Sequence, residues 1–147
     1  YYMDYKNQLV LTGALDAVGE AIRTNSGDSY RFGLEVDATV QLSDQWVWQS
    51  NMALSTNKNK DFYFRRDGIR KNLGTTNISY APGVVAASNL VYSPSTVFRM
   101  ALLSKYVGDQ YMGNIDSELS KLKSYFTNDL NISYVWITDS WIKEAQF

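Results

Sequence analysis

Two residue types on which many enzymes and metalloproteins depend are absent from this sequence. There is no cysteine, so a disulfide framework and thiolate chemistry are both excluded. There is no histidine either, which removes the commonest general base and the commonest metal ligand. A serine–histidine–aspartate triad is therefore excluded. We expect no enzymatic activity, no catalytic residue, no cofactor and no metal site.

The sequence also lacks a strong charge bias and a long apolar run. Its formal net charge is −1, which gives no reason to expect a nucleic-acid partner. No apolar run approaches the ~20 residues that a membrane-spanning helix needs. A β-barrel could still cross a membrane with such a sequence, because only every second residue of each strand has to face lipid.

Residues 30–57 contain the clearest pattern in the chain. Apolar residues occupy the even positions from Phe32 to Leu42, whereas Arg31, Glu35 and Asp37 occupy odd positions. This period of two predicts a strand with one apolar and one polar face. The strand is about as long as the ~9 to 11 tilted residues that cross a bilayer. After a polar turn at residues 43–45, a second strand continues the apolar face with Trp46, Trp48, Met52 and Leu54.

The rest of the chain predicts further strands joined by alternating long and short connections. We expect strands at 1–11, 75–92, 98–106 and 122–136 and an incomplete one at 141–147, with a break at Pro82–Gly83. The short turns fall at 43–45, 93–96 and 138–140, and the long loops without strands at 12–28, 58–74 and 108–120. Outer-membrane barrels show this asymmetry between their two ends. The prediction is an all-β, antiparallel up-and-down meander of about seven strands, one barrel segment over residues 1–147 that forms a partial arc of a transmembrane β-barrel.

The aromatic residues of the even face fall into two groups. One group lies near the short turns, and the other near the long loops: Trp46, Trp48, Tyr92, Phe98, Tyr134 and Trp136 in the first, and Tyr30, Phe32, Tyr106 and Phe126 in the second. Two belts of aromatic rings are typical of a protein that meets two membrane interfaces. The alternative is a soluble, secreted β-sandwich domain that binds glycans or proteins, in which the even face would form the core.

Several runs of residues resemble one protein family in their order and spacing. They are YMDYKNQLVLTG at 2–13, IRTN at 22–25, YRFGLE at 30–35, ALLSKYVG at 101–108 with QY at 110–111, and NDLNISY at 128–134. Together they resemble the late barrel region of TonB-dependent outer-membrane receptors, most closely those of the Bacteroidetes type. The resemblance covers nearly the whole chain.

The resemblance implies a 22-stranded barrel in the cell outer membrane with an N-terminal plug inside it. It implies active transport of a scarce nutrient, such as a metal–siderophore complex, cobalamin or a glycan. The partners would be the TonB complex, through the plug, a small nutrient ligand, and outer-membrane lipid and lipopolysaccharide. The sequence departs from the family because it shows no plug and no TonB-contacting box. It also starts without a methionine or a signal peptide, so we expect a piece of a longer protein.

The predicted loop at 58–74 is the best candidate for ligand binding. Its basic residues are interleaved with aromatic ones, and the candidate substrate-binding residues are Lys58, Lys60, Tyr63, Phe64, Arg65, Arg66 and Arg70. Such a loop could bind an anionic ligand through charge-assisted hydrogen bonds and ring stacking. It could equally be a solvated loop, or one that contacts phosphates of the outer leaflet.

Two acidic groups have simpler interpretations. Glu35 and Asp37 are spaced like a catalytic carboxylate pair, but we expect them to belong to a charged barrel wall that faces Arg99 and Lys105. The second group is Asp109, Asp116 and Glu118, which lack the dense alternation of oxygen ligands found in a calcium loop. We expect these three to be surface charges.

Overall fold

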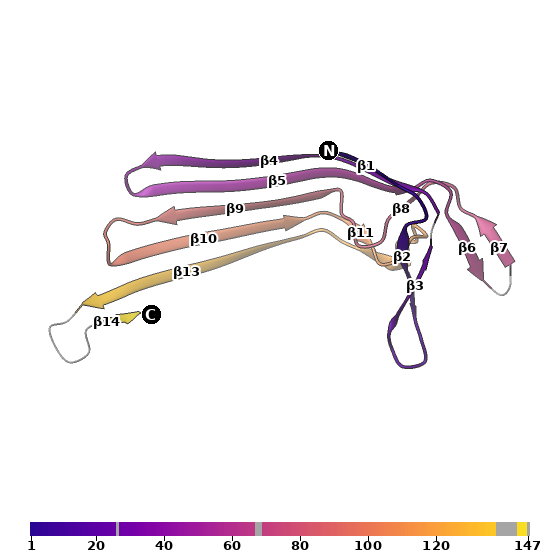
Figure 1. The fold of residues 1–147 in the computed structure, drawn as a ribbon. Helices are drawn as coiled ribbons and strands as arrows, with labels where there is room; N and C mark the ends of the chain where they lie inside the picture. The colour runs from indigo at the N-terminus through magenta and orange to yellow at the C-terminus, as the bar shows by residue number, and fades with distance from the viewer. Residues whose placement is uncertain (26, 67–68, 138–143, 147) are drawn as a thin grey trace. The chain divides into compact units, whose positions relative to one another are not determined.

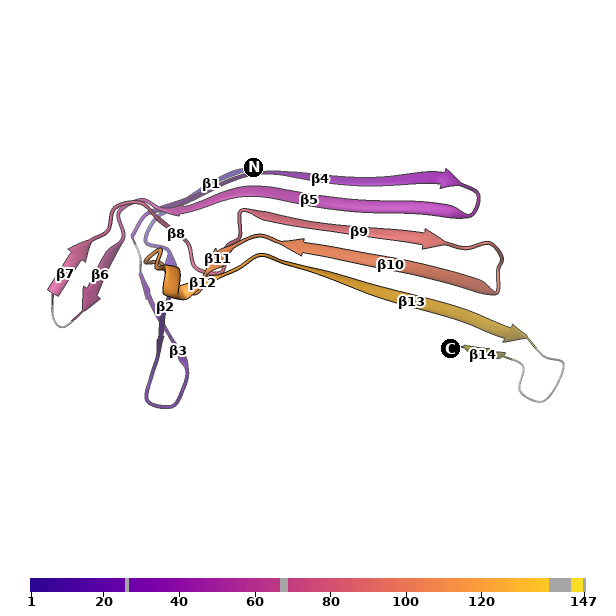
Figure 2. The same cartoon turned by 180° about the vertical axis from the view of Figure 1, so that it is seen from behind.

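The chain is described by a computed structural model over residues 1–25, 27–66, 69–137 and 144–146. Its largest sheet has eight strands, of which seven follow the order β1-β4-β5-β9-β10-β13-β14, while β8 pairs with β5 (Figure 1). The bounds are β1 Tyr2–Tyr5, β4 Ser29–Ser43, β5 Trp46–Asn59, β8 Thr76–Asn77, β9 Val84–Tyr92, β10 Phe98–Val107, β13 Tyr125–Ile137 and β14 Glu144–Gln146. Consecutive strands lie side by side, as the view from behind also shows (Figure 2). The predicted all-β antiparallel meander is confirmed, in an order consistent with part of a β-barrel wall.

The residues of the chain cluster into two compact units. We call the first the loop-end unit; it comprises Tyr1–Leu34, Ala53–Val85 and Val107–Tyr125. We call the second the sheet unit, and its described residues belong to Glu35–Met52, Ala86–Tyr106 and Phe126–Phe147. In the described ranges no helix is long and apolar enough to span a membrane.

The sheet unit is a single layer whose apolar face is uncovered. On β4, Val36 is 47% exposed and Leu42 is 58% exposed, and on β13 Leu130 is 60% exposed. The polar side chains of the same strands, such as Asp37 and Thr39, are exposed as well. The alternative of a soluble β-sandwich requires the even face to be a buried core. Within the described residues this face is exposed and forms no such core.

Side-chain contacts show that neighbouring strands of the sheet unit keep even positions beside even positions. The rings of Trp46 and Tyr92 stack with their centroids 4.5 Å apart. On the odd face, Asn89 Nδ2 donates a hydrogen bond of 3.0 Å to Gln49 Oε1. Because a shift by one residue would exchange the two faces, this register keeps apolar and polar side chains on separate sides.

Three predictions about the connections are wrong, because the long loops contain strands. The first contains most of a hairpin of β2 (Leu9–Leu15) and β3 (Ala21–Asn25), and the second contains a hairpin of β6 (Tyr63–Arg66) and β7 (Ile69–Asn72). The third contains β11 (Gln110–Tyr111), which pairs with β12 (Lys121–Leu122) just after the loop, and a 3₁₀ turn (Glu118–Ser120). The predicted strand at 1–11 is interrupted because Asn7 has φ of 52°. The turn at 138–140 lies outside the described residues.

Local polar chemistry explains the β2–β3 hairpin. Asp16 Oδ1 accepts hydrogen bonds from the backbone N–H groups of Val18 and Glu20, at 2.9 and 2.8 Å. Gly19 has φ of +89°, a left-handed conformation that glycine adopts without steric cost. Gly19, which we interpreted as a loop residue, therefore helps to close a hairpin.

The loop-end unit has a small core with a polar centre. Phe62, Ile78 and Val107 are buried apolar residues. Beside them, the fully buried Asn59 donates from Nδ2 to Thr76 Oγ1 at 3.2 Å and to Asn114 Oδ1 at 3.3 Å. These bonds connect the end of β5 to the third loop and satisfy Nδ2 of the buried amide, whereas Asn59 Oδ1 is buried without a hydrogen-bond partner among the described residues.

Candidate ligand-binding site

Three of the predicted binding residues meet at one cavity of the loop-end unit. Lys60 follows β5, Tyr63 begins β6 and Arg70 lies in β7. The cavity has a volume of about 360 Å³, and its other lining residues are Asn7, Asn25, Gly27, Asp28 and Asp61. We call it the loop cavity. Its volume is within the range of about 300 to 1,000 Å³ that small-molecule sites occupy.

The aromatic and basic sides of the loop cavity come together in one contact. The guanidinium carbon of Arg70 lies 4.0 Å from the centre of the Tyr63 ring, which is a cation–π contact. The pairing of β6 with β7 places these two residues on opposite strands of one hairpin. Tyr63 is 47% exposed, so the contact is open to a ligand.

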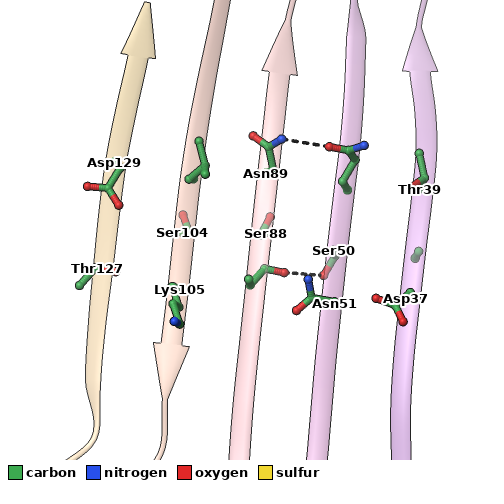
Figure 3. Close-up of a pocket in the computed structure, with 14 residues that line it drawn as sticks. Asp37, Thr39, Ser50, Asn51, Ser88, Asn89, Ser104, Lys105, Thr127 and Asp129 are labelled. Carbon is green, nitrogen blue, oxygen red and sulfur yellow. Dashed lines mark hydrogen bonds between the residues drawn. The ribbon is translucent and has the colours of Figure 1, made fainter.

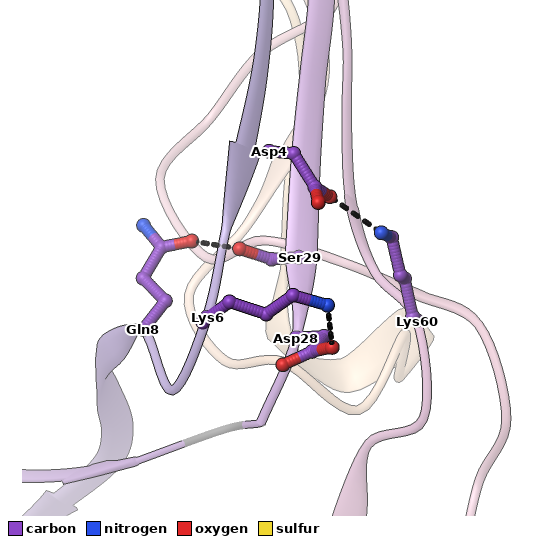
Figure 4. A network of polar contacts seen from close by, with 6 residues as sticks. All are labelled: Asp4, Lys6, Gln8, Asp28, Ser29 and Lys60. Atoms are coloured by element: carbon purple, nitrogen blue, oxygen red, sulfur yellow. Dashed lines mark hydrogen bonds and ion pairs between the residues drawn. The ribbon is translucent and has the colours of Figure 1, made fainter.

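The lysines at this end of the unit are already paired with carboxylates (Figure 4). Lys60 Nζ forms an ion pair with Asp4, and Lys6 Nζ lies 2.6 Å from Asp28 Oδ2. Nearby, Ser29 Oγ donates to Gln8 Oε1. The loop cavity is therefore lined by cations and anions together and is not a bare basic patch.

These ion pairs explain the direction of three pKa shifts. The hydrogen bond to Asp4 raises the pKa of Lys60, and the hydrogen bond to Asp28 raises the pKa of Lys6. The same bond from Lys6 lowers the pKa of Asp28. Each shift favours the charged form, so both lysines and Asp28 are ionised at neutral pH.

Lys58 and Phe64 do not line the loop cavity. Lys58 Nζ donates to Asn77 Oδ1 at 2.7 Å, and Lys58 lines a separate cavity of about 190 Å³. Phe64 is half-buried. Arg65 and Arg66 belong to β6, where the backbone pairs them with Arg70 and Ile69. The structure thus brings Lys60, Tyr63 and Arg70 together, and it does not place Lys58 or Phe64 beside them.

Sequence reasoning missed the residues that complete the loop cavity. Asn25, Gly27 and Asp28 belong to a run that we interpreted only as turn-forming, and Asn7 was assigned to a strand. The ion pair between Lys6 and Asp28 joins residues 22 positions apart. Only a prediction of the fold of the first loop could have placed them beside Tyr63.

The sheet unit has a second hollow, lined mainly by odd-numbered residues and also by Ser50, Ser88 and Ser104 (Figure 3). Its volume is about 470 Å³, and its polar lining includes Asp37, Thr39, Gln49, Asn51, Asn89, Lys105, Thr127 and Asp129. Asp37 and Lys105 both line it, but among the described residues no ion pair joins them, contrary to the expected pairing across strands. The carboxylates of this hollow thus lie among amides and hydroxyls.

The acidic residues of the third loop hold that loop in place. Asp109 Oδ1 accepts from the backbone N–H of Ser124 at 2.6 Å, and its Oδ2 lies 3.1 Å from Lys121 Nζ. These contacts lower the pKa of Asp109. Asp116 Oδ1 accepts from the backbone N–H of Asn77 at 2.9 Å. Within the described ranges no group of three carboxylates could hold a metal ion.

The fold has counterparts among solved structures, and two of them are receptors for siderophores. One is the siderophore receptor PiuA of Acinetobacter baumannii, with a TM-score of 0.68 and 16% identity over 90% of this chain and 18% of that chain. Another is a mutant of the ferric enterobactin receptor PfeA of Pseudomonas aeruginosa, with a TM-score of 0.57 and 16% identity over 90% of this chain and 20% of that chain. No protein-family model and no curated protein sequence matches this chain.

These similarities define the fold of the chain. At 16% identity they show a shared fold: this chain has the fold of a segment of the two receptors. The chain spans about a fifth of the length of the two receptors. What those receptors bind is a property of the receptors themselves.

Proposed function

We propose that the chain is one segment of the barrel of a TonB-dependent outer-membrane receptor, of the Bacteroidetes type that its sequence resembles. One observation carries the proposal: the strands form a single layer with an apolar and a polar face, both uncovered, and this layer superposes on siderophore receptors over 90% of the chain. An exposed apolar face is unfavourable in water, by roughly 25 cal/mol per Å². Lipid on the even face and water on the odd face remove that penalty.

In this proposal the short turns face the periplasm and the hairpin loops face the outside. The loop cavity then takes part in binding the nutrient, and the two structural neighbours favour a metal–siderophore complex over cobalamin or a glycan. Arg70 supplies charge-assisted hydrogen bonds, and the Tyr63 ring offers a stacking surface. Lys58, Lys60, Phe64, Arg65 and Arg66 make up the remainder of the binding loop.

The segment contributes a wall and an extracellular gate to the transporter and performs no chemistry. The other partners in this proposal are the TonB complex, which acts through a plug, and the lipid and lipopolysaccharide of the outer membrane. Uptake of the nutrient would then require the TonB complex as its source of energy.

The absence of cysteine provides a direct test in intact cells. Single cysteines replace Ile69, which is 72% exposed in β7, or Asp44 in the turn between β4 and β5, in a receptor without other cysteines. A membrane-impermeant maleimide should label the Ile69→Cys protein in whole cells and the Asp44→Cys protein only after permeabilisation. Equal labelling of both in whole cells, or recovery of the protein in the soluble fraction, would contradict the proposal.

A further inference from the structure

The even face of the sheet unit contains a row of polar residues among apolar ones. The row consists of Ser50 in β5, Ser88 in β9, Ser104 in β10 and Asn128 in β13. We call these four residues the polar row. They are half-buried or exposed, and no described element covers the face on which they lie.

The strand register aligns the four residues directly opposite one another. Ser55 N donates to Gly83 O at one end of the β5–β9 pair, and Ser93 N donates to Gln45 O at the other, both at 2.8 Å. Both bonds fit one register, and that register places Ser50 opposite Ser88.

The two remaining strand pairs continue the alignment. Gly108 N donates to Val84 O at 2.8 Å, a register that places Ser88 opposite Ser104. Ser104 Oγ donates directly across to Asn128 Oδ1 at 2.6 Å. The polar row therefore crosses four strands, with each residue directly opposite the next.

Most polar atoms of the row have protein partners. Trp48 Nε1 donates to Ser88 Oγ at 2.8 Å, and Ser50 Oγ donates to Ala87 O at 3.3 Å. The Asn128 amide differs, because its oxygen accepts from Ser104 while its Nδ2, in an exposed side chain, has no acceptor among the described residues. The two N–H bonds of the Asn128 amide are thus available beside the apolar side chains of the same face.

The neighbours of the row indicate what meets these N–H groups. Tyr106 and Phe126 lie on the loop side of Ser104 and Asn128, two residues or about 7 Å away along the strands. On the turn side, at the same spacing, lie Leu102 and Leu130, which are 40% and 60% exposed. Aromatic rows mark the headgroup level of a bilayer. The end of the polar row formed by Ser104 and Asn128 then lies just inside that level, where the carbonyl oxygens of acyl esters accept hydrogen bonds.

We propose that the polar row is a lipid-binding ledge, and that Asn128 Nδ2 donates to the acyl-ester carbonyl of one lipid in the loop-side leaflet. This inference rests on the proposed function, because it requires the even face to be in lipid. The occupant is a lipid because exposed apolar side chains, Phe126 and Leu130, flank Asn128 on both sides along β13, and the free group of Asn128 is a donor. Ester-linked acyl chains supply the complementary acceptors.

Ether lipids provide the test, because they keep the headgroup and chains but have no carbonyl. The whole receptor is reconstituted in an equimolar mixture of ester-linked and ether-linked phosphatidylcholine with identical chains, and the lipid that co-purifies is identified by native mass spectrometry. The unaltered receptor should retain the ester lipid with a preference of roughly five- to tenfold, the effect of about one neutral hydrogen bond. The Asn128→Leu receptor should show a ratio near one.

The matched control is Asn131→Leu, which makes the same change on the opposite face of the same strand and should retain the ester preference. An unaltered receptor without ester preference, or an Asn128→Leu receptor that keeps it, would overturn the lipid ledge. Quenching of tryptophan fluorescence by brominated acyl chains separates this failure from a failure of the proposed function. Quenching without ester preference refutes the ledge alone, whereas no quenching refutes lipid contact altogether.

Discussion

The ring of Tyr1 lies directly over Gly33 on the neighbouring strand. A Cβ atom added to Gly33 would come within 2.7 Å of the Tyr1 ring and within 2.7 Å of the backbone oxygen of Leu54. The two residues are also bonded through their backbones, since Gly33 N donates to Tyr1 O at 3.1 Å. Gly33 is thus the position at which the ring of Tyr1, the residue before β1, can pack against β4 without a side chain in the way.

Gly33→Ala should therefore destabilise the pairing of β1 with β4. The backbone oxygen of Leu54 cannot move away as a flexible side chain would, so we expect a loss of about 1 to 3 kcal/mol in the free energy of unfolding. Thermal unfolding of the whole receptor in detergent measures this loss. Gly83→Ala is the control, because its nearest atom, Ser55 O, would be 3.3 Å away; an equal effect of both changes would argue against a steric cause at Gly33.

Substitutions at Arg70 and Tyr63 test the loop cavity. Arg70→Ala removes the donors and the cation–π contact, and we expect binding of ferric enterobactin, used as the probe, to weaken by roughly 10-fold, or ~1.4 kcal/mol. Tyr63→Phe keeps the ring and should have a small effect, whereas Tyr63→Ala should weaken binding in the same direction as Arg70→Ala. Isothermal titration measures the affinities. Lys58→Ala is the comparison outside the loop cavity. If it weakened binding as much as Arg70→Ala, the ligand would not be bound by the loop cavity alone.

Acid should loosen the β2–β3 hairpin, because one of the contacts at its base is the ion pair between Lys6 and Asp28. The pKa of Asp28 is lowered by Lys6, so the ion pair stabilises the folded loop above the ordinary pKa of an aspartate and is lost as the pH falls through the lowered value. The pKa of Lys6 is raised, so the contribution is also lost as the pH rises through a value above 10.5. The pair is fully present between about pH 5 and 9.

A spin label at Val18, which is 82% exposed near the turn of that hairpin, reports this change. Its mobility should increase when the pH falls from 7 to 3, and high salt should produce part of the same increase. In Asp28→Asn the label should already be mobile at pH 7 and should change little with acid. If the mobility of the label in Asp28→Asn still increased with acid, a group other than Asp28 would cause the pH response.

A charge on the even face should be more disruptive than one on the odd face. Val36→Arg places a guanidinium in lipid, at an expected cost of about 2 to 4 kcal/mol near the middle of the bilayer. Thr39→Arg, on the odd face of the same strand, should cost less than 1 kcal/mol because its side chain remains in water. Unfolding in urea from lipid vesicles measures both. Equal losses would mean that the two faces do not differ in their solvent.

The sequence predicted the long strands because every second residue in them must be apolar, and residues 32–42 satisfy that rule without exception. It did not predict β3, β6, β7 or the second half of β2, because these segments show no regular alternation of apolar and polar residues. The bond between Asn59 and Asn114 joins residues 55 positions apart, and the loop cavity combines Asn7, Asp28 and Asp61 from separate loops. Contacts of this kind depend on folded loops and leave no periodic signal.

The most direct test of the account measures the solvent at successive positions of one strand. Spin labels at residues 36 to 41 of β4 are exposed in vesicles to oxygen, which concentrates in lipid, and to a water-soluble nickel complex. The account predicts that oxygen contact peaks at 36, 38 and 40 and nickel contact at 37, 39 and 41. Nickel contact of equal strength at all six positions would contradict it.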